Sequence, residues 1–203
     1  MPDVAALREL FETEAERDRP EGDRPDVGII MGSDSDLEVM SGASEVLEAL
    51  GFEELTDYED PPESPYSYET WVVSAHRTPD LLYAYGETAE ARGVDVILAG
   101  AGGKSADLPN MTASLAYPLP VIGIPVQEKS VDSVLGMPAG APITAVDAGK
   151  SGNAALSAVQ ILARDDETLR NRLVERHEEQ ATEVATVSES LHSQGTRAFR
   201  ESR

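Results

Sequence analysis

The sequence predicts a three-layer α/β/α domain built on a parallel β-sheet. Short apolar runs alternate with segments of helical periodicity, which is typical of strands joined by right-handed crossovers. The run 27–31 is apolar throughout, as expected for a strand that is buried on both faces of such a sheet. At 203 residues the chain is long enough for one such domain and short for two.

An amphipathic segment precedes the first strand. Val4, Leu7 and Phe11 recur at helical spacing, and the pattern ends before Pro20. A second stripe of spaced leucines and valines begins after Asp165 in a charged segment. We therefore expect three parts: residues 1–25 as an N-terminal helical extension and linker, 26–164 as the α/β domain, and 165–203 as a C-terminal helical extension.

The elements of the domain follow in order. The first strand ends in a loop at 32–36, and a helix over 37–50 is closed by Gly51. The acidic, proline-containing segment 57–66 predicts an exposed loop. The further predicted strands cover 68–73, 94–98, 119–126 and 142–146, and the further helices begin near residues 79, 108, 131, 151 and 165.

The charge balance restricts the partners. Acidic residues number 38 against 16 lysines and arginines, which gives a formal net charge of −22. Such a surface repels nucleic acid and anionic membranes, so we expect neither as a partner. Only three lysines occur, Lys104, Lys129 and Lys150, which is either chance or a sign that some of them serve a task.

The same charge predicts adaptation to concentrated salt. A Debye length of about 3 Å at 1 M screens the self-repulsion of a compact acidic chain. We expect the thermal unfolding midpoint to rise between low and molar KCl, measured by circular dichroism. An unchanged midpoint would contradict the hypothesis of a halophilic protein.

Cysteine is absent, which excludes disulfides, thiolate nucleophiles and cysteine metal sites. The loop at 32–36 has neither the spacing of a Walker A loop nor that of a dinucleotide fingerprint, so ATP and NAD lose support as ligands. No apolar run approaches the roughly 20 residues that span a bilayer, and the acidic start lacks the features of a secretory signal. These observations predict a cytoplasmic protein.

The segment 74–79, Ser-Ala-His-Arg-Thr-Pro, is the main candidate for chemistry. It joins a predicted strand to a helix with Pro79 in its first turn, so His76 and Arg77 lie where α/β domains bind ligands. The alternative is an ordinary surface pair. The other two histidines, His177 and His192, lie among acidic residues of the last segment, and we expect both to be solvated.

Two further loops follow predicted strands. Ser33 and Ser35 stand at a helix start, where they form either a cradle for phosphate or an ordinary N-cap. The run 99–103 has glycine at three of five positions, which allows close approach of backbone to a ligand or serves as a tight connection.

Four motifs in order give a resemblance. Residues 31–36 (MGSDSD), 74–79 (SAHRTP), 99–103 (AGAGG) and 137–140 (MPAG) closely resemble the N5-carboxyaminoimidazole ribonucleotide mutases of purine (IMP) biosynthesis, whose relatives are the aminoimidazole ribonucleotide carboxylases. The likeness covers about residues 27–162. It implies a flavodoxin-like fold, a homo-octamer with active sites at subunit interfaces, a small ribonucleotide substrate, and carboxyl transfer without ATP, metal or organic cofactor.

The resemblance also implies site residues. His76 is the general acid/base, a role that suits imidazole because it changes protonation state close to neutral pH. The other candidates are substrate contacts: Ser33, Asp36 and Arg77, supported by Ser35, Ser74, Ala101, Gly102, Lys104 and Ser105.

One segment departs from the mutase pattern. After the double glycine, the run 104–109 (KSADLP) is one residue longer, and Asp107 stands where the bacterial mutases carry a second histidine. The Lys-Ser pair and the later Ala116-Tyr117-Pro118 resemble the carboxylases that use carbon dioxide directly. Against that, the central motif at 76–79 (HRTP) has the mutase form, so the mutase is the first interpretation and the carboxylase a close alternative. A non-catalytic flavodoxin-like binding module is a distant third.

Overall fold

The computed structural model describes residues 3–202, so the outermost residues of both predicted extensions, 1–2 and 203, lie outside the described residues. The chain divides into two compact units, one ending at Ile161 and one starting at Leu162. The predicted boundaries of the three parts, after residues 25 and 164, remain a proposal.

The first unit contains a six-stranded sheet in the order β2-β3-β1-β4-β5-β6. Every pairing is parallel, which confirms the predicted sheet. The first crossovers place β2 and β3 on one side of β1, and the later ones place β4, β5 and β6 on the other side. The carboxyl ends of β1 and its neighbours β3 and β4 therefore surround a crevice that favours ligand binding. The strands are β1 (Val27–Met31), β2 (Glu53–Glu54), β3 (Ser67–Val72), β4 (Val96–Ala101), β5 (Val121–Pro125) and β6 (Thr144–Ala145).

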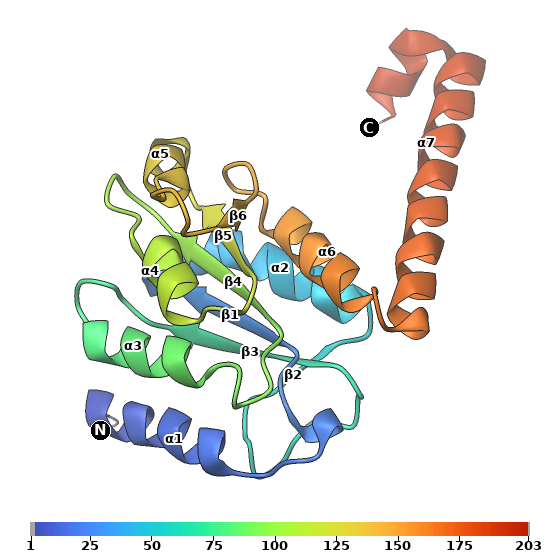
Figure 1. Cartoon of the computed structure of the whole chain (residues 1–203). Helices are drawn as coiled ribbons and strands as arrows, with labels where there is room; N and C mark the ends of the chain where they lie inside the picture. The colour runs from blue at the N-terminus through green and yellow to red at the C-terminus, as the bar shows by residue number, and fades with distance from the viewer. Residues whose placement is uncertain (1–2, 203) are drawn as a thin grey trace. The chain divides into compact units, whose positions relative to one another are not determined.

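Helices cover both faces of this sheet, as Figure 1 shows: α3 and α4 lie on one face and α2 and α6 on the other. Outside α3 lies α1, which packs along it. The helices are α1 (Val4–Glu16), α2 (Leu37–Ala49), α3 (Pro79–Thr88), α4 (Leu108–Leu115), α5 (Val131–Leu135) and α6 (Ser151–Leu162), with 3₁₀ turns at Glu21–Asp23, Asp34–Asp36 and Glu128–Ser130.

Three strand predictions differ from the structure. The short strand β2, which pairs with β3, was not predicted, because its two glutamates carry no strand signal. The predicted glycine loop begins later, since Ala99, Gly100 and Ala101 belong to β4 and are buried between β1 and β5. The predicted strand 142–146 is reduced to the two-residue β6 at the sheet edge.

An aromatic cluster joins α1 to the domain. Phe11 is fully buried, and its ring meets Trp71 at 5.0 Å and Tyr85 at 5.4 Å between centroids, both edge-on. Edge-to-face pairs of this kind add to the free energy gained by burying the rings. The N-terminal helix therefore closes the hydrophobic core on the α3 side.

A buried ion pair lies beside this cluster. The Arg92 guanidinium lies 4.8 Å from the ring centroid of Phe11 and of Tyr85, and it donates from Nη1 to both carboxylate oxygens of Glu69 at 2.6 and 2.7 Å. Tyr58 donates to Glu69 and accepts from Arg92. Since Tyr58 is 8% exposed, the predicted loop 57–66 is not exposed throughout.

Protonation states in this cluster follow from the charges. Burial is the largest single effect and acts to lower the pKa of Arg92, but Glu69, Tyr58 and Tyr85 together outweigh it, and the pKa is raised. Burial also raises the pKa of the Tyr58 hydroxyl, and Glu69 adds to that rise. Both shifts favour a charged Arg92 and a neutral Tyr58 in the folded protein.

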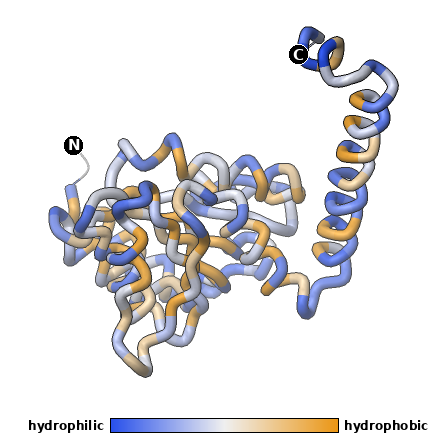
Figure 2. Tube along the Cα trace, turned by 90° about the horizontal axis from the view of Figure 1, so that it is seen from above, coloured by the Kyte–Doolittle hydropathy of each residue, from blue (hydrophilic) through white to orange (hydrophobic). Residues whose placement is uncertain are grey.

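The second unit contains α7 (Glu167–Glu201), in which Asp166 caps the first turn by accepting from Leu169 N at 2.9 Å. Hydrophobic residues recur along an otherwise hydrophilic helix (Figure 2). The helix is broken at Gly195, which has φ +77°. His177 and His192 are both exposed, as predicted.

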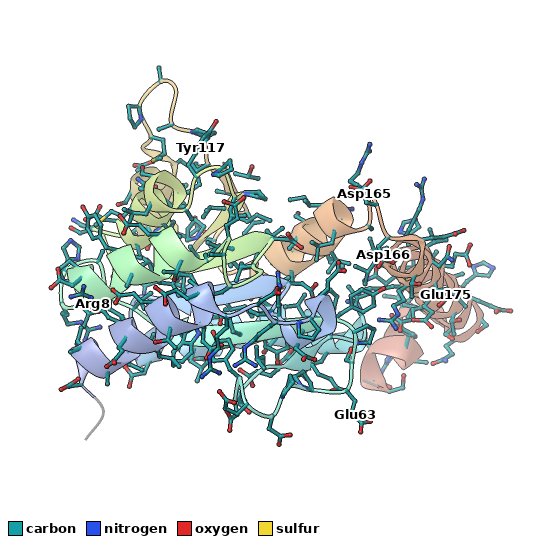
Figure 3. The ribbon with its side chains drawn as sticks, turned by 60° about the horizontal axis from the view of Figure 1, so that its bottom comes forward. Arg8, Glu63, Tyr117, Asp165, Asp166 and Glu175 are labelled. Atoms are coloured by element: carbon teal, nitrogen blue, oxygen red, sulfur yellow. The ribbon has the colours of Figure 1, made fainter. Side chains whose placement is uncertain are left out.

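The acidic surface is visible in the side chains. Glu63 and Glu175 project outward from their segments (Figure 3), and both are exposed. None of the described helices has the length and apolar composition that crossing a membrane requires.

Candidate active site

A pocket of about 520 Å³ opens at the carboxyl ends of the central strands. Loops that follow β1, β3, β4 and β5 contribute to it, which is where the strand order places a ligand site. The lining residues are Gly32, Ser33, Ser35, Asp36, Ser74, Ala75, His76, Arg77, Ala101, Gly102, Gly103, Ser105, Asp107, Leu108, Gln127 and Lys129.

The loop after β3 holds the histidine and the arginine. Thr78 closes this loop, because its hydroxyl accepts from Ser74 N at 2.9 Å and its own N–H donates to Ser74 O at 2.9 Å. Thr78 is the N-cap residue of α3, but its side chain makes no capping bond to the helix. The turn 74–78 is thereby fixed, and His76 stands at its exposed tip with 61% of its side chain accessible.

Arg77 is anchored to two loops. It donates from Nη2 to the carbonyl of Gly32 at 2.7 Å and from Nε to the Ser74 hydroxyl at 3.3 Å. These bonds tie the loop after β3 to the loop after β1. The remaining guanidinium donors supply a permanent positive charge in the pocket, which suits a phosphate or carboxylate.

The loop after β1 presents its hydroxyls at a helix start. Ser33 precedes a 3₁₀ turn and accepts from Ser35 N at 3.4 Å, so it acts as an N-cap in this structure. Both serines line the pocket, and the backbone N–H groups of a helix start favour an anion there. The cap and the phosphate cradle are therefore compatible.

Asp36 is the buried acid of the pocket. Burial raises the pKa of Asp36, while the backbone N–H of Ser33, the charge of Arg77 and the backbone N–H of Gly102 act in the opposite direction. Gly102 has no side chain where a Cβ would stand 3.0 Å from Asp36 Oδ1. The carboxylate thus lies directly against the backbone of the glycine loop.

Glycine at position 100 is required for helix packing, and not for the close approach of a ligand that the sequence suggests. A Cβ at this position would stand 2.1 Å from the sulfur of Met40, a buried residue of α2. The glycine allows α2 to pack on β4 rather than a ligand to approach. The part of the run 99–103 that lines the pocket is Ala101, Gly102 and Gly103.

The loop after β4 contributes Asp107. Its Oδ2 lies 3.0 Å from His76 Nε2, so the two residues form a hydrogen-bonded pair across the pocket. Ser105 also lines the pocket, whereas the exposed Lys104 does not.

Several lining residues were not among the predicted site residues, and two of them come from a strand end that was not considered. Gln127 and Lys129 follow β5 and reach the same pocket. The signal for Lys129 was the scarcity of lysine, and for both it was their place after a central strand. Among the described residues, no group of three or more histidine and acidic side chains is arranged to hold a metal ion.

Comparison with known proteins gives consistent results. Residues 26–183 match the family model described as AIR carboxylase. The chain is 45% identical over 176 residues to the N5-carboxyaminoimidazole ribonucleotide mutase of Bacillus subtilis, covering 83% of this chain and 99% of that one. It is also 40% identical over 186 residues to the phosphoribosylaminoimidazole carboxylase of Saccharomyces cerevisiae, covering 89% of this chain and 30% of that longer protein.

The fold has a close counterpart among solved structures. PurE of Treponema denticola superposes with a TM-score of 0.68, at 24% identity, over 83% of this chain and 99% of that one. This likeness supports the flavodoxin-like fold that the sequence motifs imply.

Proposed function

Since the chain belongs to the AIR carboxylase family, we propose that it converts N5-carboxyaminoimidazole ribonucleotide to 4-carboxy-5-aminoimidazole ribonucleotide in purine biosynthesis. The observation that carries the proposal is the 45% identity to a mutase over 99% of that enzyme's length. The pocket supports it, because it combines a histidine, an arginine and hydroxyls at a helix start.

The proposed reaction moves one carboxyl group within the substrate. His76 as imidazolium gives a proton to the exocyclic nitrogen while the bond from that nitrogen to the carboxyl carbon breaks and carbon dioxide forms. The ring carbon then attacks carbon dioxide, and the neutral His76 removes the proton from that carbon. The histidine ends in the state in which it began, so no other proton source is needed.

The remaining pocket residues are proposed to bind the ribonucleotide. Arg77 and the helix start at Ser33 and Ser35 suit the phosphate, and the carboxylate of Asp36 suits the ribose hydroxyls. Ser74, Ala101, Gly102 and Ser105 line the same pocket and complete the proposed contacts. Lys104 does not line the pocket, so the structure gives no support for the predicted contact between Lys104 and the substrate.

Supplying the two candidate substrates separates the two activities. We expect the purified protein to form product from N5-carboxyaminoimidazole ribonucleotide without ATP, at a rate that added bicarbonate does not change. Consumption of aminoimidazole ribonucleotide with bicarbonate, and not of the N-carboxylated substrate, would instead favour the carboxylase, the activity named for the yeast relative. Product formation is followed by its ultraviolet absorbance.

The assembly and setting are further proposals. We propose a homo-octamer with sites at subunit interfaces, in a salt-rich cytoplasm. Leu37 and Val72, which adjoin the site loops, are 51% and 49% exposed, as expected for residues that a neighbouring subunit covers. Light scattering tests the assembly, with an expected mass of eight times 21.7 kDa, and cell fractionation tests the location.

A further inference from the structure

The environment of His76 is built from three separate elements. Its Nε2 lies 3.0 Å from Asp107 Oδ2, and the second carboxylate oxygen, Oδ1, accepts from the hydroxyl of Ser133 at 3.3 Å. His76 belongs to the loop after β3, Asp107 to the loop after β4, and Ser133 to α5. The three residues form a chain of hydrogen bonds that ends at the histidine.

Asp107 itself is held from two directions. Its backbone carbonyl accepts from Met111 N at 3.0 Å in the first turn of α4. Ser133, which donates to the Asp107 carboxylate, is fixed as well. The Asn110 side chain donates to the Ser133 carbonyl at 2.7 Å and so joins α4 to α5. The carboxylate therefore has a defined place before any substrate binds.

This geometry determines which nitrogen of neutral His76 carries the hydrogen. An ionised carboxylate only accepts hydrogen bonds, so the Nε2 that faces Asp107 carries a hydrogen. In the neutral imidazole the lone pair is then on Nδ1, and Nδ1 is the atom that gives and takes protons.

We infer that Asp107 is a positioning residue for His76, holding its ring and its Nε2–H tautomer so that Nδ1 exchanges protons with the substrate. The inference rests on the proposed function and deepens it at the same site. It also gives a role to the aspartate that stands in place of the second histidine of the bacterial pattern.

Orientation, rather than stability, is the effect of this pair. The side chains of His76 and Asp107 are 61% and 45% exposed, and ion pairs this exposed add little to folding stability. A carboxylate that orients a histidine acts instead on the chemical step. Loss of Asp107 is therefore expected to lower kcat and leave both KM and the fold nearly unchanged.

The test compares three variants with the wild-type enzyme in high salt. Asp107→Asn permits both tautomers, because an amide either donates or accepts, and we expect kcat to fall about 10- to 100-fold with KM within about threefold. Asp107→Glu keeps the carboxylate and is expected to retain more activity than Asp107→Asn. The matched control is Asp132→Asn, which removes one exposed charge next to Ser133 and is expected to leave kcat unchanged.

Each outcome bears on one proposal. If the wild type is active and Asp107→Asn keeps its kcat, or loses activity through KM alone, the positioning role is refuted and the proposed function stands. Equal losses in the asparagine and glutamate variants would also refute it. A wild type that is inactive on both substrates refutes the proposed function, and this role falls with it.

Discussion

His76→Asn is expected to lower kcat by about 10²- to 10⁴-fold, the usual contribution of a general acid/base. Asparagine can still hydrogen-bond Asp107, but it carries no proton that it can exchange with the substrate near neutral pH. Substrate affinity is expected to change little, because the proposed phosphate contacts lie on Arg77 and the loop after β1. Steady-state kinetics and equilibrium binding of the substrate measure the two effects separately.

The other histidines supply the controls. His177 and His192 are exposed on α7, so His177→Asn and His192→Asn are expected to keep wild-type kcat. Circular dichroism checks that His76→Asn is folded, which is expected because His76 lies at an exposed loop tip. Near-normal turnover of His76→Asn would remove the histidine from the proposed mechanism.

The second large effect concerns stability. Arg92→Gln is expected to lower the free energy of unfolding by about 3–5 kcal/mol, because it leaves the Glu69 carboxylate buried without its partner. The side chains of Arg92 and Glu69 are 0% and 1% exposed, so water does not replace the lost contact. The substitution also removes the cation that contacts the rings of Phe11 and Tyr85.

Urea unfolding at one protein concentration and one salt concentration measures this effect, since assembly contributes to apparent stability. Arg8→Gln is the control: Arg8 forms an exposed pair with Glu12 on α1, and its loss is expected to cost less than about 1 kcal/mol. The double variant Arg92→Gln, Glu69→Gln should be more stable than Arg92→Gln alone, because it no longer buries an unpaired charge. A double variant less stable than Arg92→Gln would contradict this account.

The sequence by itself determined the class of fold and the loops that carry the site. Apolar runs that alternate with helical segments fix a parallel sheet, because each strand must return through a crossover. The polar ends of the runs 27–31 and 68–73 then mark the ligand-binding edge, and His76, Arg77, Ser33 and Asp36 do line one pocket. These features depend on neighbours in the chain, which a sequence displays directly.

Only the tertiary structure decided which distant residues are partners. Glu69 is 23 residues from Arg92, and nothing in either neighbourhood shows that both are buried together. Asp107 is 31 residues from His76, and the strand order brings their two loops to one edge of the sheet. Strand order and side-chain packing are set by contacts across the fold, so the pairing of His76 with Asp107 became visible only there.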